Sequence, residues 1–88
     1  MIKRSLEIRN SLGLHARAAG SLVRLSSTFQ SEITVERDGI KANSKSIMGL
    51  LMLAAAAGST ILVTARGGDE EEAMTAIEDL ERRNFNES

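Results

Sequence analysis

The residues best suited to chemistry in this chain lie together in the segment Gly13-Leu14-His15-Ala16-Arg17. His15 is the only histidine, and the chain has no cysteine, so a thiol cannot serve as its nucleophile. An imidazole has an ordinary pKa of about 6.5, so near neutral pH one of its nitrogens can attack an electrophile. Arg17 adds a guanidinium, a group that holds phosphate oxygens through paired hydrogen bonds. These residue types at this spacing favour chemistry on a phosphoryl group.

The local sequence predicts that His15 stands at or just before the first turn of a helix. Gly13 favours a turn before it, and the good helix formers Ala16, Arg17, Ala18 and Ala19 follow it. Backbone N–H groups without intrahelical partners collect at such a helix start, where the macrodipole is positive and anions bind. A lone histidine in this place can also be a simple helix cap, and these residues alone leave that second interpretation open.

A second motif, Ser44-Lys45-Ser46-Ile47-Met48-Gly49, follows about thirty residues later. Together the two motifs resemble the HPr family, the histidine-containing phosphocarriers of the bacterial sugar phosphotransferase system. The resemblance covers nearly the whole chain. One departure is Ala18, where the family usually has proline. Because alanine also propagates a helix well, we expect the helix start to form.

The resemblance implies a role for each motif. His15 would accept a phosphoryl group from phosphorylated enzyme I and pass it to an EIIA-type protein, with Arg17 stabilising the phosphate. Ser46 would be a regulatory phosphorylation site, and a serine kinase or phosphorylase would then be a further partner. The chain would be a carrier with a phosphohistidine intermediate, not an enzyme on its own, and would need no cofactor. The two motifs point to different branches of the family, so the sugar or nitrogen-related branch stays open.

Composition excludes several other classes of protein. The formal net charge is −1 at pH 7, and the aromatic residues are two phenylalanines, which argues against binding of nucleic acid. With one histidine and no cysteine, the chain cannot form a thiolate metal site or a cluster of histidine ligands. No apolar run reaches the length of a membrane span. We therefore expect a soluble, cytoplasmic protein made of one domain over residues 1–88.

Periodicity predicts four strands and three helices in an α+β domain. Alternating or β-branched residues indicate strands at 2–9, 32–37, 40–43 and 59–65, with the last in the middle of the sheet and residues 40–43 at an edge. Helices are expected at 16–27, 47–53 and from Asp69 to Arg83, with Asp69 as N-cap, Glu72 completing a capping box and a frayed end beyond Arg83. The pattern equally suits a ferredoxin-like fold. The resemblance instead implies an open-faced β-sandwich, with a four-stranded antiparallel sheet and three helices on one face.

The predicted helix at 47–53 is apolar nearly all round. If Leu50 and Leu53 face the core, then Ile47, Met48 and Leu51 form an exposed patch on which a partner can dock. A fully buried helix is the other interpretation of this pattern. We also expect partner contacts on the preceding helix, at Gly20 and Arg24, and a monomeric protein. A different class of function stays open too: a small ferredoxin-like regulatory ligand-binding domain, in which His15 is only a cap and the apolar helix joins two copies.

Overall fold

The strands and helices form where the sequence periodicity predicts them. The computed structural model describes residues 1–86. Its elements in chain order are β1 (Ile2–Glu7), α1 (Ala16–Ser26), β2 (Glu32–Arg37), β3 (Ile40–Asn43), α2 (Ile47–Met52), β4 (Thr60–Arg66), α3 (Glu70–Arg82) and a short 3-10 turn, η1 (Asn84–Asn86).

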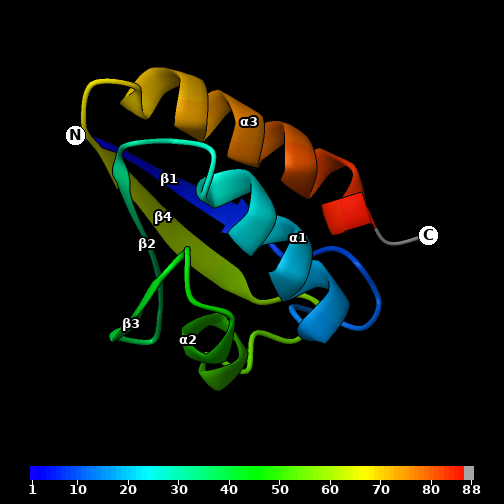
Figure 1. Ribbon diagram of the computed structural model, residues 1–88. Coiled ribbons are helices and arrows are strands. Elements are labelled where there is room, and N and C mark those ends of the chain that lie inside the picture. The colour runs from blue at the N-terminus through cyan, green and yellow to red at the C-terminus, as the bar shows by residue number, and fades with distance from the viewer. Residues whose placement is uncertain (87–88) are drawn as a thin grey trace.

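The strands form one antiparallel sheet in the order β1-β4-β2-β3. β4 lies inside the sheet and β3 at its edge, as predicted. α1 and α3 run side by side over one face of the sheet (Figure 1). α2 packs against α1 and lies beside β3. The predicted α+β fold, an open-faced sandwich with three helices, is therefore confirmed.

The core lies between the inner face of the sheet and the helices. Every second strand residue points toward the helices and packs against the apolar faces of α1 and α3. α2 contributes one further buried leucine. The buried core residues of the strands and helices include Leu6, Ile33, Val35, Ile61, Val63, Leu22, Leu50, Ile77 and Leu80. This packing holds α1 and α2 in place, and these two helices carry the residues of both motifs.

The prediction that the chain frays beyond Arg83 is wrong for residues 84–86. Phe85 is only 1% exposed and belongs to the core cluster, and η1 packs against both α1 and α3. Phe85 and its neighbours Asn84 and Asn86 all have positive φ angles of 54–63°. Such backbone is costly for non-glycine residues, but burial of a phenylalanine ring contributes about 1.5–3 kcal/mol in return. Residues 87 and 88 lie outside the described residues.

Asp69 is the N-cap residue of α3, but the predicted capping box is wrong. The Asp69 side chain makes no capping bond and instead accepts hydrogen bonds from the backbone N–H groups of Gln30 and Ser31 and from the Ser31 hydroxyl. The Ser31 hydroxyl, followed by the Gln30 N–H, lowers the pKa of Asp69 below its usual value. The carboxylate therefore ties the loop between α1 and β2 to the start of α3, rather than closing its own helix.

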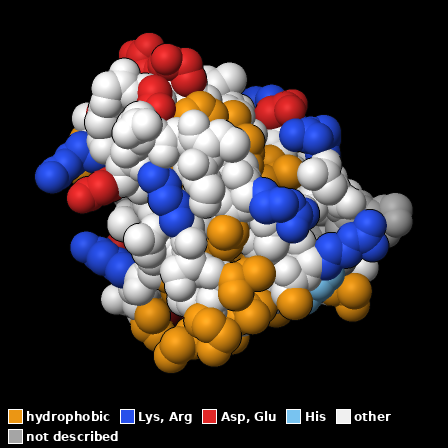
Figure 2. Space-filling model, in the orientation of Figure 1, with side chains coloured by type: hydrophobic (Ala, Val, Ile, Leu, Met, Phe, Trp, Pro, Cys, Tyr) orange, Lys and Arg blue, Asp and Glu red, His pale blue; other side chains and the backbone are white. Residues whose placement is uncertain are grey.

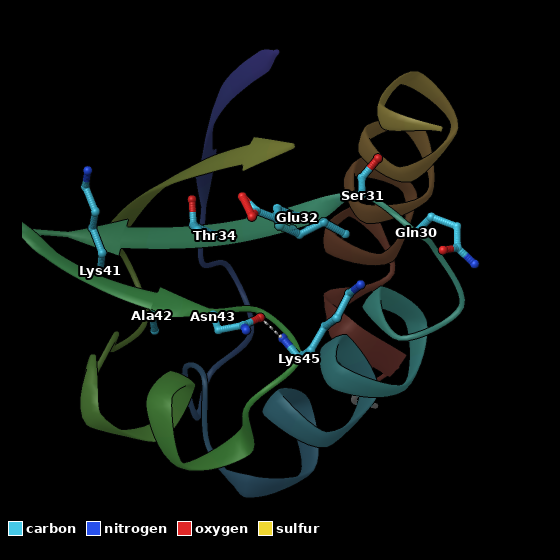
Figure 3. A pocket seen from close by; sticks show the side chains of 9 residues that line it. Gln30, Ser31, Glu32, Thr34, Lys41, Ala42, Asn43 and Lys45 are labelled. Carbon is cyan, nitrogen blue, oxygen red and sulfur yellow. Dashed lines mark hydrogen bonds between the residues drawn. The ribbon is translucent and has the colours of Figure 1, made fainter. Parts of the chain in front are cut away.

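A shallow hollow of about 370 Å³ opens beside β2 and β3 (Figure 3). Most of its lining residues have polar side chains; they are Gln30, Ser31, Glu32, Ile33, Thr34, Lys41, Ala42, Asn43 and Lys45. The ammonium of Lys45 donates to the Phe29 carbonyl at 2.8 Å, and its backbone N–H donates to Asn43 Oδ1 at 2.9 Å. The first bond ties Lys45 to the segment after α1 and the second closes the turn after β3, and neither His15 nor Arg17 lines the hollow.

Candidate functional site

A tight turn delivers the chain to the start of α1. The Gly13 N–H donates to the Asn10 carbonyl at 3.0 Å, and the Asn10 side-chain Nδ2 donates to the Gly13 carbonyl at 2.5 Å. Gly13 has a φ of +68°, and a Cβ built on it would lie 2.5 Å from the Ala55 carbonyl oxygen. Only glycine fits both the conformation and the space. The Leu14 N–H then donates to the same Ala55 oxygen at 2.8 Å.

His15 occupies the N-cap position of α1, as the sequence predicted. Its backbone is extended, with φ −81° and ψ −177°, and its carbonyl accepts the Ala19 N–H at 2.8 Å. Its Nδ1 accepts the backbone N–H of Arg17 at 3.2 Å. A ring nitrogen that accepts a hydrogen bond carries a lone pair, so the proton of the neutral imidazole is on Nε2. Nδ1 therefore presents its lone pair at the positive end of the helix.

Among the described residues, the start of α1 carries no negatively charged side chain of its own. The first turn has no acidic residue, and Arg17 is exposed. Among the described residues, the Arg17 guanidinium makes neither a hydrogen bond nor an ion pair. Ala18 is buried in the first turn and the helix begins at Ala16, so alanine in place of the family's proline leaves the helix start intact.

Ser46 is the N-cap of α2. Its Oγ accepts the Gly49 N–H at 3.2 Å, and its carbonyl accepts the Leu50 N–H at 3.1 Å. Ser44, the other serine of the motif, is fully buried and shares a 2.6 Å hydrogen bond with the Ser26 hydroxyl. Ser46 is half-buried, so of the two serines it is the one that a partner can reach.

α2 is partly exposed, which settles the question that its sequence pattern left open. Leu50 and Leu53 are buried, whereas Ile47 and Met48 are 41% and 66% exposed and Leu51 is half-buried. The sequence analysis missed Met52, which is 75% exposed. Its spacing of four residues from Met48 could have revealed it, because such residues share a helix face. We call Ile47, Met48, Leu51 and Met52 the α2 patch.

The α2 patch lies in a larger arrangement of side chains on one side of the molecule. Figure 2 shows hydrophobic side chains gathered over α2, with the histidine at their edge and several Lys or Arg side chains beside them. Exposed hydrophobic groups in such a cluster mark an interaction surface. His15, the candidate phosphoryl acceptor, and the α2 patch, the candidate docking surface, therefore lie on the same side of the molecule.

Gly20 lies where α1 packs on α2, and Arg24 lies one turn further along α1. Gly20 is buried, and a Cβ built on it would lie 3.4 Å from Arg24 Nη1 and 3.7 Å from Ile47 Cδ1. Side chains of the same chain therefore lie directly over this glycine. Arg24 is exposed, and its Nη2 donates to the Ser21 hydroxyl at 3.3 Å.

The described residues show neither a metal-binding cluster nor a membrane-spanning helix. No group of three or more potential metal-ligating side chains occurs among residues 1–86. Within the same part of the chain, every helix is too short or too polar to cross a bilayer. The arrangement is thus that of a small α+β domain that presents one helix-capping histidine beside an exposed apolar helix.

Known proteins place this arrangement in a family. A family model described as the PTS HPr component phosphorylation site matches residues 2–82. The phosphocarrier protein HPr of Neisseria meningitidis is 49% identical over 87 residues, which cover 99% of this chain and 98% of that protein. A crystal structure of HPr from Thermoanaerobacter tengcongensis is similar with a TM-score of 0.95 and 44% identity, covering 100% of this chain and 99% of that one. The chain therefore belongs to the HPr family.

The family membership decides between the two classes of function. The chain is a phosphocarrier of the phosphotransferase system and not an enzyme by itself, as the two motifs predicted. The alternative of a ferredoxin-like regulatory domain is not favoured. The HPr-like protein Crh of Bacillus subtilis is also similar, at 42% identity over 77 residues, which cover 88% of this chain and 91% of Crh.

Proposed function

We propose that His15 receives a phosphoryl group from phosphorylated enzyme I and passes it to an EIIA-type acceptor. The observation that carries this proposal is the position of His15 Nδ1, which accepts the Arg17 N–H at 3.2 Å at the start of α1. In the neutral imidazole this nitrogen carries the lone pair, and on attack it exchanges the hydrogen bond from the Arg17 N–H for the new bond to phosphorus. It also lies where the helix dipole and the first-turn N–H groups stabilise a phosphoryl group.

The transfer is an in-line displacement at phosphorus. The lone pair of His15 Nδ1 forms the new N–P bond while the N–P bond of the donor phosphohistidine breaks, and its electron pair stays on the donor nitrogen. Charge on the three phosphoryl oxygens is redistributed during this step. The first-turn N–H groups and the Arg17 guanidinium supply positioning and electrostatic stabilisation, which account for most of the catalysis in such transfers.

The α2 patch is the docking surface that enzyme I and the acceptor share. Its centre is apolar, and Arg17 and Arg24 are exposed on the neighbouring helix, so the matching partner surface is apolar with an acidic rim. Gly20 contributes by letting Arg24 and Ile47 lie close above it. Replacement of Met48 by Asp should weaken binding of both partners together. Unchanged affinity for both partners, in a folded variant, would exclude this surface.

Ser46 is a regulatory phosphorylation site next to the docking surface. A phosphate on its hydroxyl adds about −1.5 to −2 charges at pH 7. The serine precedes Ile47 and Met48 directly, so this charge would lie at the edge of the α2 patch. A partner that brings its own phosphoryl group and an acidic rim would then be repelled. A kinase or phosphorylase that recognises Ser46 is the partner that this regulation requires.

We propose further that the protein acts as a monomer in the cytoplasm. Its large apolar core residues are buried within one chain, so folding does not need a second copy. A similar protein, HPr of Thermoanaerobacter tengcongensis, has a crystal structure as a dimer, at 45% identity and a TM-score of 0.79 over 99% of this chain and 100% of that one, so the monomer needs a direct test. Light scattering at micromolar concentration tests the monomer, and a mass of twice the chain would refute it.

Labelling from phosphoenolpyruvate through enzyme I tests the central proposal. The wild-type chain should acquire one acid-labile phosphate, and a His15→Ala variant should acquire none. Because the His15 side chain is half-buried at a helix start, we expect the variant to keep its fold, which circular dichroism would verify. Label on a folded His15→Ala variant would show that another residue is the acceptor.

A further inference from the structure

Asn10 is a buried polar residue whose role the two motifs do not explain. It is only 3% exposed, and it closes the turn before α1 through two hydrogen bonds to Gly13. Its carbonyl accepts the Gly13 N–H at 3.0 Å, and its side-chain Nδ2 donates to the Gly13 carbonyl at 2.5 Å. A side-chain bond that reinforces a backbone bond between the same two residues restrains the turn more than the backbone bond alone.

The turn leads directly to the phosphoryl acceptor. From Gly13, the chain is held against the opposite segment by the Leu14 N–H, which donates to the Ala55 carbonyl at 2.8 Å. His15 follows Leu14 and takes its N-cap position. Two contacts therefore hold the chain just before His15: the Asn10 side chain on the Gly13 carbonyl, and Ala55 on Leu14.

The direction of the imidazole depends on this restraint. The 3.2 Å contact from the Arg17 N–H to His15 Nδ1 forms only if the cap residue keeps its extended backbone. In a transfer between two proteins, the attacking nitrogen must lie in line with the bond that breaks, and a misplacement of about 1 Å costs up to about 100-fold in rate. A looser turn would leave docking intact, because the α2 patch is on a different element.

We infer that Asn10 is a positioning residue for phosphoryl transfer: through the Gly13 carbonyl, it sets where His15 Nδ1 points. This inference rests on the proposed role of His15. It predicts that loss of the Asn10 amide slows transfer more than it lowers stability or affinity. A residue that only stabilises the fold would lower stability without affecting the transfer step.

The test compares Asn10→Ala with Ser26→Ala. Ser26 also makes a buried side-chain hydrogen bond, 2.6 Å to the Ser44 hydroxyl, but it lies at the other end of α1. Both variants should lose stability to a similar degree, because each loses one buried bond. With enzyme I in steady state, Asn10→Ala should lower kcat about tenfold at an unchanged KM. Ser26→Ala should leave both constants near the wild-type values.

A spectroscopic measurement without partners accompanies the kinetics. The ¹⁵N shifts of His15 report which ring nitrogen carries the proton, and Asn10→Ala should move the tautomer populations toward those of a free imidazole, whereas Ser26→Ala should not. If Asn10→Ala does not fold, Asn10→Ser is used, because its shorter side chain ends one bond short of the Gly13 carbonyl. Wild-type kcat and wild-type ¹⁵N shifts in a folded Asn10 variant would overturn the inference. Absence of label on the wild-type chain would instead overturn the proposed function.

Discussion

The starts of α1 and α3 differ in the charges that surround them. α1 begins with His15 as its cap and has no acidic residue in its first turn. α3 begins with Asp69 and has Glu70, Glu71 and Glu72 in its first turn. Both helix starts are positive ends of a macrodipole. The chain neutralises the positive end of α3 with its own carboxylates, whereas the first turn of α1 has none, and in the proposed function a phosphoryl group binds there.

The carboxylates at the α3 end are also used to join segments together. Glu70 accepts the Gly67 N–H at 3.0 Å and contacts the N-terminal ammonium at 2.8 Å, and both contacts lower its pKa, the ammonium most. Asp69 holds the loop at Gln30 and Ser31. The carboxylates of Asp69 and Glu70 thus have partners within the chain, whereas Arg17 at the α1 end is exposed. On the proposed function, this difference separates a helix start that stabilises the fold from one that carries the reaction.

Among variants that keep His15, the largest effect should come from removing the cation at the start of α1. Arg17→Ala should lower kcat for phosphoryl acceptance about 100-fold, the size found when a charge-stabilising donor is removed from a transition state. The α2 patch is unchanged in this variant, so KM for enzyme I should change little. Steady-state kinetics measure the two constants separately. A rise in KM at a constant kcat would mean that Arg17 serves docking and not transfer.

A negative charge at the start of α2 should have the next largest effect. Ser46→Asp should lower the rate of acceptance at least about tenfold at low salt, because a like charge then faces the arriving partner. Added salt should restore part of the rate through screening. Since Asp is itself a good N-cap, the melting temperature should stay near that of wild type. An unchanged rate at low ionic strength would refute the proposed inhibition.

A third variant makes the start of α1 resemble that of α3. Ala16 is exposed in the first turn of α1, and Ala16→Glu puts a carboxylate there. It should stabilise the helix slightly and slow acceptance about threefold, since a charge near a helix end is worth about 0.3–1 kcal/mol. Ala16→Gln is the matched neutral control. Equal rates for the two variants would show that the open positive end does not matter.

The smallest effect should appear at the α3 end and only in stability. The pKa of Asp69 is lowered on folding, so its contribution is fully present above the ordinary pKa of about 3.8 and is lost as the pH falls through the lower folded value. Asp69→Asn should therefore be less stable than wild type at pH 7, and the difference should shrink below about pH 4. Urea unfolding at several pH values measures this, with Glu71→Gln as an exposed control. A difference that is constant with pH would mean that the Asp69 charge is not what stabilises the loop.

Much of the fold follows from local patterns in the sequence. Period-two alternation predicts the strands, and Asp38-Gly39 between two of them is typical of a primed hairpin turn; both residues have the positive φ angles that this turn requires, 52° and 82°. The place of His15 at a helix start is likewise predicted by its immediate neighbours, and a serine before an apolar helix is a preferred N-cap, as Ser46 is here. Such features depend on the backbone preferences of neighbouring residues, and these are encoded locally.

Features that depend on distant segments could not be predicted in the same way. The spacing of Ser21 from Arg17 and Arg24 is typical of an exposed helix face, but Ser21 is buried and accepts a hydrogen bond from Arg24 Nη2. After α2, the chain turns at Ala54, whose φ is +51°, within a run of small residues that has no local signal for a turn. That turn brings Ala55 to Gly13 and Leu14, and this contact is invisible in either segment alone.

The sequence by itself determined the chemistry of this protein: one imidazole, one nearby guanidinium, a serine cap and an apolar helix, each read from short spacings. Tertiary structure alone decided how these groups are aimed and supported. The Asn10 side chain bonds the Gly13 carbonyl in the turn before His15. The Asp69 side chain accepts the Ser31 hydroxyl instead of capping α3. Phe85 is buried in the core, although the sequence predicted a frayed end there. The physical reason is that hydrogen bonds and burial between distant segments compete with local preferences, and the outcome depends on packing that only the folded chain creates.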